Sequence, residues 1–409
     1  MDRDGKLLRE LAKQFAEAAA LDAQREKIGM WKRHNALRPG RPMVMIDQLP
    51  WNELNVDDEL TLVCEDPFHR SLEWTMKSLL YKWRRFPVDM VIDPVIEIPR
   101  FISGTRIGPA VEEDISMTDL TSGVVSHNYH DLLAEPESLN LIRPVTVEVT
   151  PRDDQEKLER ARDIFGDIIP ARLSGISMHC GVWDWISQLR GVEPILYDIA
   201  DRPEFTLDMV NLFVDAYMNM LDQFEAFGLL DPDLSLIHCT GAYTDELPPP
   251  ERPGGAKASN VWAFGLAQVL GSVSPAMYDE FEIEPVKRLL DRFGLLYYGC
   301  CDPIDMKIND LRKLKTLRKI SVSPWARKEL CAELIHGDYV FSAKPNPAFL
   351  AAENLDEDLI RRDLEETARI CREHHTNCEL ILKDVSTVKY RPQNLTRWAE
   401  IAMDVVKFV

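Results

Sequence analysis

Cysteine is scarce in this sequence, with eight among 409 residues. That number is too small for the dense disulfide framework of a small secreted domain. There is also no run of about 18 apolar residues, which a transmembrane helix would need. The first residues, MDRDGK, lack the apolar stretch of a signal peptide. We therefore expect a cytoplasmic protein in which clustered cysteines bind metal or take part in catalysis.

Positive charge is scarce relative to negative charge, because 48 Lys and Arg face 68 Asp and Glu, a net charge of −20. Such a surface repels phosphate backbones and anionic lipid, so we expect neither a nucleic-acid nor a membrane partner. A Gly-x-Gly-x-x-Gly pattern is missing after every expected strand, which argues against a dinucleotide-binding fold. The apolar fraction of 45% and the charged fraction of 28% are typical of a soluble globular protein.

Short apolar strands alternate with helices along most of the chain. The sequence predicts strands near 43–47, 88–94, 233–239, 295–298, 317–323, 339–343 and 378–384, and helices near 4–37, 69–85, 156–165, 203–228, 274–293, 354–374 and 393–407. This alternation indicates an α/β protein with a parallel sheet, and seven or eight such units predict a (β/α)8 TIM barrel. We expect residues 85–409 to form the barrel and residues 1–84 a helical and extended N-terminal cap. The segment 98–155 is expected to be an irregular excursion over the barrel mouth.

One stretch, GLLYYGCCDP at 294–303, carries the strongest chemical signal. Its apolar run ends at Gly299 and is followed by Cys300 and Cys301. Because Pro303 cannot continue a central strand, the thiols should lie at or just past the strand end. In an α/β barrel the carboxyl ends of the strands form the active-site face, and two thiols there suggest a metal site. The alternative is that both are small buried core residues.

Other expected strands also end in groups that a barrel would bring to one face, namely Asp93, Glu97, His179, His238, Cys239, Lys344, Lys383 and Asp384. Thiolate, imidazole and carboxylate ligands suit Zn²⁺, and a catalytic zinc keeps one position open. We expect Cys300 or Cys301 to bind zinc together with His238 and Asp384. As alternatives, His238 is a hydrogen-bonded core histidine, and Asp384 is a helix cap or an ion-pair partner of Lys383.

Aromatic residues crowd the same loops and could line a flat, apolar pocket for an aromatic substrate. Tyr243 and Trp262 flank a loop rich in proline and glycine at 247–255 and are the best pocket candidates, and His179 joins them as an expected substrate-binding residue. The alternative for most of these aromatics is ordinary core packing. Asp93 and Tyr298 are the expected catalytic acids.

Three stretches resemble the uroporphyrinogen decarboxylase superfamily: GVWDWISQLRG at 181–191, LYDIADRPE at 196–204 and SPAMYDEF at 274–281. The resemblance covers roughly residues 85–408 and implies a (β/α)8 barrel. The superfamily contains decarboxylases and zinc methyltransferases that work with corrinoid proteins. The decarboxylases bind substrate carboxylates with an N-terminal Arg-Gln-Ala-Gly-Arg-Tyr stretch. This sequence has no such stretch, since residues 43–53 are MVMIDQLPWNE.

The methyltransferases carry His-x-Cys-Gly after the sixth strand and a further cysteine near the last strand. Here YGCC at 298–301 keeps the cysteine but has tyrosine in place of histidine, and Asp384 stands near the position of the late cysteine. The resemblance to this corrinoid-dependent zinc branch implies transfer of a methyl group from a small donor to Co(I) on a partner corrinoid protein. A methoxylated aromatic is the expected donor, so the reaction would be an O-demethylation. The alternative is a uroporphyrinogen decarboxylase-like lyase without metal. The sequence does not identify the donor, the corrinoid partner or the oligomeric state, for which a homodimer is one candidate.

Overall fold

The computed structural model describes residues 2–117, 120 and 125–407. Its centre is a seven-stranded sheet with the order β1-β15-β14-β13-β12-β11-β8, and all neighbouring strands in it run parallel. The strands are β1 (Met43–Ile46), β8 (Met178–Cys180), β11 (Trp262–Gly265), β12 (Leu295–Tyr298), β13 (Leu317–Val322), β14 (Val340–Ala343) and β15 (Asn377–Leu382). The predicted α/β class with a parallel central sheet is confirmed, and the arrangement is consistent with a TIM-barrel-like fold. Closure into an eight-stranded barrel stays a prediction.

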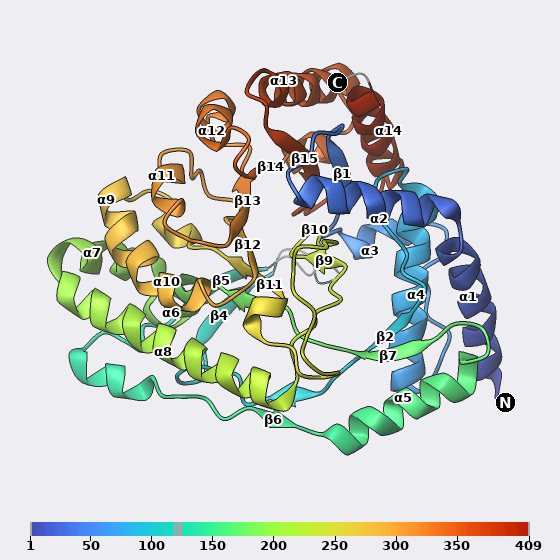
Figure 1. The fold of residues 1–409 in the computed structure, drawn as a ribbon, viewed down its shortest axis with the longest axis horizontal. Coiled ribbons are helices and arrows are strands. Elements are labelled where there is room, and N and C mark those ends of the chain that lie inside the picture. The colour runs from blue at the N-terminus through green and yellow to red at the C-terminus, as the bar shows by residue number, and fades with distance from the viewer. Residues whose placement is uncertain (1, 118–119, 121–124, 408–409) are drawn as a thin grey trace.

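Helices surround the sheet on the outside, as Figure 1 shows. They are α1 (Arg3–Ala19), α2 (Asp22–Asn35), α3 (Trp51–Leu54), α4 (Pro67–Arg85), α5 (Pro151–Phe165), α6 (Val182–Arg190), α7 (Val192–Asp201), α8 (Pro203–Phe227), α9 (Pro275–Tyr278), α10 (Glu284–Leu290), α11 (Ile308–Leu311), α12 (Lys328–Ile335), α13 (Glu357–Glu373) and α14 (Gln393–Lys407). A π-helical turn, Asp279–Ile283, joins α9 to α10. Because both faces of the sheet are covered, β11, β12 and β14 are buried along their whole length.

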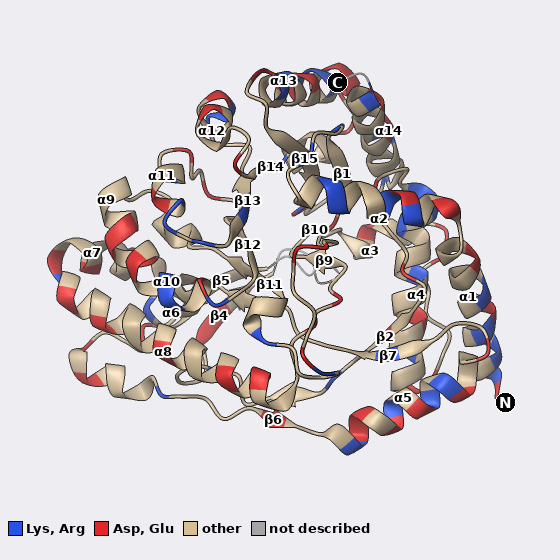
Figure 2. Cartoon of the chain, in the orientation of Figure 1, with Lys and Arg blue, Asp and Glu red and all other residues tan. Residues whose placement is uncertain are grey.

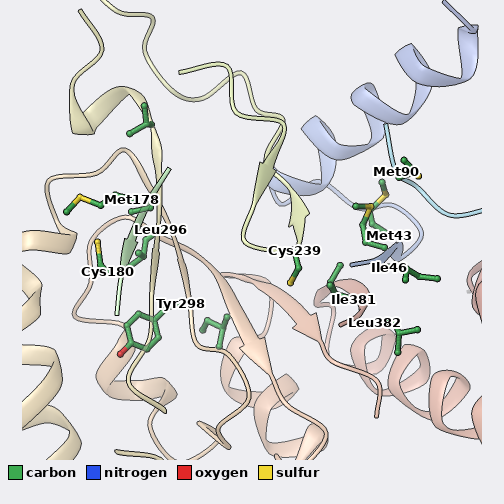
Figure 3. Packing of buried hydrophobic residues seen from close by; sticks show 14 of the residues in the cluster. Met43, Ile46, Met90, Met178, Cys180, Cys239, Leu296, Tyr298, Ile381 and Leu382 are labelled. Atoms are coloured by element: carbon green, nitrogen blue, oxygen red, sulfur yellow. The ribbon is translucent and has the colours of Figure 1, made fainter. Parts of the chain in front are cut away.

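Side chains on the two faces of the sheet pack into separate clusters, as the period of two along a strand requires. Phe264 and Tyr297 belong to an inner cluster, whereas Leu296 and Tyr298 belong to the main cluster between the sheet and its helices. Figure 3 shows part of the main cluster, including Leu296 and Tyr298. Figure 2 shows that the charged residues lie mainly on the outer helices, while the central strands are largely uncharged. Within the described residues, the structure has no helix that combines the length and apolar character needed to span a membrane.

A small hairpin lies in the middle of the ring of strands and helices (Figure 1). It consists of β9 (Leu236–Ile237) and β10 (Thr240–Gly241), which pair antiparallel. The prediction of a single strand over 233–239 is therefore wrong, because the chain reverses at His238, whose φ is 55°. Ile237 packs with Trp262, Phe264 and other residues of the inner cluster. The hairpin thus fills the interior with side chains and carries His238 inward.

The prediction of a strand over 88–94 is also wrong, since this segment forms no strand pairing. It contacts α2 and β1 instead: the Lys27 ammonium donates to the carbonyls of Val88 and Met90, and the Asp89 N–H donates to the Val44 carbonyl. The next strand, β2 (Ile96–Pro99), pairs in parallel with β7 (Ala171–Ser174) outside the central sheet. An apolar run therefore indicated burial correctly, but it did not indicate the partner.

The N-terminal segment contributes to the central sheet, because β1 pairs with β15. The domain boundary after residue 84 stays a prediction, and β1 lies on its N-terminal side. The described part of 98–155 is irregular, as expected; residues 118–119 and 121–124 of this excursion lie outside the described residues. Its short elements are β3 (Ile102–Ser103), β4 (Glu113–Ser116), β5 (Ser126–Tyr129), a 3-10 helix (Pro136–Leu141) and β6 (Glu148–Val149).

Candidate metal centre

Two cysteines and a carboxylate meet where β12 and β15 end. β12 ends at Tyr298, and the chain then turns at Gly299 with a φ of 92°, a conformation that favours glycine. After this turn come Cys300, which is buried, and Cys301, which is partly exposed, and their Sγ atoms lie 3.4 Å apart. The Cys301 thiol donates to Oδ2 of Asp384 over 2.9 Å. One donor atom from each of the three residues lies within 4.8 Å of the others, so together they could hold one ion.

His238 reaches the same cluster from the hairpin. Its Nε2 lies 3.8 Å from Sγ of Cys300, and its ring stacks on Phe264 with centroids 4.1 Å apart and planes 7° apart. Burial lowers the pKa of His238, so the ring is neutral at neutral pH. Neutral imidazole is the form that binds metals. All four residues that the sequence suggested as ligands are therefore neighbours in space.

Lys383 also belongs to this cluster, although it was not among the expected metal ligands. Its ammonium lies 3.1 Å from Sγ of Cys300, 3.6 Å from Sγ of Cys301 and 2.6 Å from Oδ2 of Asp384. The ion pair between Lys383 and Asp384, which the sequence offered as an alternative for Asp384, is present in the structure. Asp384 has a φ of 54°, and both side chains approach the sulfurs.

The two thiols differ in acidity. Hydrogen bonding with the neighbouring Cys301 lowers the pKa of Cys300 to about 4 against the opposing effect of burial, and His238 and Lys383 lower it further. The pKa of Cys301 is raised, first by its hydrogen bond to Cys300 and then by burial. Although burial alone would raise the pKa of Asp384, hydrogen bonds from Cys301 and Lys383 lower it. A thiolate and a carboxylate therefore surround a single ammonium group.

A pocket of about 400 Å³ opens beside this cluster. Its lining includes Cys301, Lys383 and Asp384 on one side and Trp325 with Pro347 on the other. The Trp325 residue is 69% exposed, an unusual position for so large an apolar group. Pockets that combine an apolar lining with a few convergent polar groups are typical ligand sites. Trp325 follows the end of β13, a position that could have identified it from the sequence.

Three predicted functional residues lie around a different pocket. The Tyr243 hydroxyl donates to Oδ2 of Asp93 over 2.8 Å, and both residues line a pocket of about 500 Å³ together with Trp262. Trp262 pairs with Leu295 at the start of β12, whereas the cysteines follow its end. With a rise of about 3.3 Å per residue, the strand separates the two ends by roughly 10 Å. The structure does not bring Asp93, Tyr243 or Trp262 to the cysteine cluster.

Tyr298 also points away from the cluster, although it is close in sequence. Its buried hydroxyl lies 2.8 Å from the Tyr278 hydroxyl and donates to Oε1 of Glu282 over 2.6 Å, on the helix-covered face of the sheet. It therefore cannot supply a proton at the thiols. His179 lies closer, because its ring contacts the Phe264 ring edge-on with centroids 5.0 Å apart. Phe264 thus separates His179 from His238.

Comparison with known proteins supports the fold. Neither a protein-family model nor a curated protein matches the sequence. Among solved structures, a methyltransferase from Methanosarcina mazei matches with a TM-score of 0.51. The match is 12% identical in sequence and covers 92% of this chain and 97% of that protein. At this identity the likeness shows a shared fold over nearly the whole length of both chains.

Proposed function

We propose that this protein is a methyltransferase that moves a methyl group from a small donor to Co(I) of a corrinoid protein, with zinc bound at the cysteine cluster. The observation that carries the proposal is the convergence of Cys300, Cys301, Asp384 and His238 beside an open pocket. The fold shared with the Methanosarcina methyltransferase supports the same reaction class. The sequence resemblance to the corrinoid-dependent branch supports Co(I) of a corrinoid protein as the methyl acceptor.

The donor set fits zinc. Thiolate, neutral imidazole and carboxylate are the ligands that zinc takes in proteins, and three of them leave a position for a substrate. The Lys383 ammonium lies among these donors, so the cluster already stabilises one positive charge. Because Lys383 has a long, flexible side chain, it could withdraw toward the adjoining pocket when a metal binds. Bound zinc would supply Lewis-acid stabilisation of the donor oxygen.

The protein's own side chains would position the donor and stabilise the leaving group. In the proposed reaction the methyl–oxygen bond breaks, its electron pair stays on oxygen, and the Co(I) electron pair forms the new bond to carbon. The Trp325 ring offers a flat apolar surface for a methoxylated aromatic in the pocket. The Lys383 ammonium faces the same pocket and would oppose the negative charge that develops on oxygen. Water would then protonate the released phenolate.

A methyl-transfer assay tests this proposal. Purified protein is mixed with reduced cobalamin and with methoxybenzenes, methanol or methylamines in turn, and methylcobalamin is followed by its absorbance. We expect turnover with a methoxylated aromatic, none in Cys300→Ser/Cys301→Ser, and normal turnover in Cys331→Ala, which changes a buried cysteine in α12.

The other outcomes of this assay separate the parts of the proposal. Turnover with methanol or methylamines alone would keep the methyltransferase and remove the aromatic ether as donor. If no donor is turned over and CO₂ is released from a polycarboxylate, the result would instead support the lyase without metal. Turnover in the double variant equal to that of the wild type would show that the cysteines have no part in the reaction.

A further inference from the structure

A second pair of cavities lies away from the cysteine cluster, and Asp93 and Tyr243 line both of them. The inner cavity, of about 130 Å³, is bounded largely by apolar side chains that include Trp31, Met45 and Met76. The outer pocket, of about 500 Å³, is bounded by the loops 231–234 and 242–250. The hydrogen-bonded Asp93–Tyr243 pair therefore lies between a small, largely apolar inner cavity and a larger, more polar outer pocket, and lines both.

Asp93 differs from the other charged residues that line these cavities. Those residues each have an ion-pair partner: Lys82 with Asp47, Asp89 with Arg41, Lys32 with Asp245, and Glu97, Asp231 and Asp233 with Arg172. Within the described part of the chain, no Lys, Arg or His lies within ion-pair distance of Asp93. Its hydrogen-bond partner at the cavity is the neutral hydroxyl of Tyr243. Asp93 thus has no direct ion-pair partner, and the Arg172 guanidinium acts on its carboxylate only from beyond ion-pair distance.

A partly buried carboxylate without a counter-ion is costly, since burial disfavours its charged form. Burial accordingly raises the pKa of Asp93, against the hydrogen bonds from Tyr243 and Ser235 and the positive charge of Arg172. A ligand that carries a positive charge would relieve this cost, and an apolar group on that ligand would fill the inner cavity. The volume of the inner cavity, about 130 Å³, is close to that of an apolar cavity of about 150 Å³ that can hold benzene. Methionine side chains such as Met45 and Met76 adapt readily to a ligand's shape.

We propose that the Asp93–Tyr243 junction binds a small organic ammonium ion, with the ammonium group at the Asp93 carboxylate and its alkyl or aryl group in the inner cavity. The charges that line the outer pocket also favour a positively charged ligand, because three aspartates, Asp231, Asp233 and Asp245, outnumber the single Lys32 there. This site is separate from the proposed zinc centre and does not depend on methyl transfer.

Binding of matched probes tests the site by isothermal titration calorimetry. Benzylamine, benzyl alcohol and benzoate share a ring but are positive, neutral and negative at pH 7.5. We expect saturable binding of benzylamine alone, a loss of about tenfold or more in affinity in Asp93→Asn, and a change of less than about threefold in Asp215→Asn. The second variant removes an ion-paired carboxylate on α8 that lines neither cavity.

Three results would overturn the proposal: no saturable binding of benzylamine, equal binding of benzyl alcohol, or unchanged benzylamine affinity in Asp93→Asn. Near-UV circular dichroism checks that this variant keeps the native packing. Where the spectrum changes, the comparison of benzylamine with benzyl alcohol on the wild-type protein decides, because these probes differ in charge. Cys300→Ser/Cys301→Ser should bind benzylamine normally, which separates this site from the zinc centre.

Discussion

Replacing Lys319 by methionine should strongly destabilise the protein and loosen the hairpin that carries His238. The Lys319 ammonium is fully buried and donates to Oε2 of Glu379 over 2.9 Å, to the Thr240 hydroxyl over 3.0 Å and to the Gly241 carbonyl over 3.1 Å. Thr240 and Gly241 form β10, so this one side chain joins the hairpin to β15. Although burial alone would raise it, Lys319 helps to lower the pKa of Glu379 and keeps that carboxylate ionised.

The magnitude follows from the charge that would be left behind. Removing one partner of a buried ion pair costs about 3–5 kcal/mol, because the other charge stays buried without compensation. With a denaturant dependence of about 3 kcal/mol per molar urea, the unfolding midpoint of Lys319→Met should fall by roughly 1–1.7 M. The additional change Glu379→Gln removes the stranded charge and should restore part of the loss. The control Lys315→Met, at an exposed residue, should cost less than about 0.5 kcal/mol.

The loss in Lys319→Met should also depend on pH, through His34. The His34 Nε2 lies 3.1 Å from Oε2 of Glu379, and burial lowers its pKa, with a further contribution from the Lys319 charge. Without Lys319, His34 can take up a proton and become the cation beside Glu379. This proton stabilises the folded variant below the ordinary histidine pKa of about 6.5 and is lost as the pH rises. The destabilisation should therefore be larger at pH 8 than at pH 6. A midpoint within about 0.3 M of the wild type at both pH values would refute the reasoning.

Three further outcomes follow from the structure. Tyr298→Phe should lose about 1–2 kcal/mol of stability with its hydrogen bond to Glu282 but keep methyl transfer, as parallel urea and cobalamin assays would show. Trp325→Ala should raise KM for a methoxylated aromatic about tenfold and leave zinc content unchanged; an unchanged KM would exclude Trp325 from the donor pocket. Burial raises the pKa of Glu282 to about 8 from its usual 4.5, so the stability from the protonated carboxyl is lost as the pH rises through that range. Glu282→Gln should lose less stability between pH 5 and pH 8, and an identical pH profile would contradict this assignment.

Much of the central sheet could be predicted because its strands are locally distinct. The runs at 295–298, 317–322, 340–343 and 377–382 are short, contain several large apolar residues each, and are followed by turns or polar residues. The run at 88–94 has the same character, but it contacts α2 and bonds to β1 through Asp89 without forming a strand of its own. Hydrophobic pattern reports burial and does not report which element covers the segment. For the same reason β11 was not predicted, and its aromatic residues were assigned to loops.

The candidate site was predictable in its thiols and less so in its geometry. Gly299 and Pro303 place Cys300 and Cys301 at a strand end, where the structure has them. The orientations of His238 and Asp384 depend on φ values of 55° and 54°, which non-glycine residues seldom adopt and which have no clear mark in the sequence. These two turns accompany the approach of His238 and Asp384 to the sulfurs. The expected meeting of Asp93 with the cysteines failed because the segment 88–94 leaves the sheet.

Zinc content is the most direct measurement of the central claim, that the cysteine cluster is a metal centre. Wild-type protein, Cys300→Ser/Cys301→Ser and Cys331→Ala are purified in parallel, dialysed against metal-free buffer and measured by inductively coupled plasma mass spectrometry. We predict about one zinc per chain in the wild type and in Cys331→Ala, and less than about 0.1 in the double variant, because a serine hydroxyl replaces thiolate poorly as a zinc ligand. Full zinc occupancy in Cys300→Ser/Cys301→Ser, or a wild-type protein that binds none when zinc is supplied, would contradict the claim.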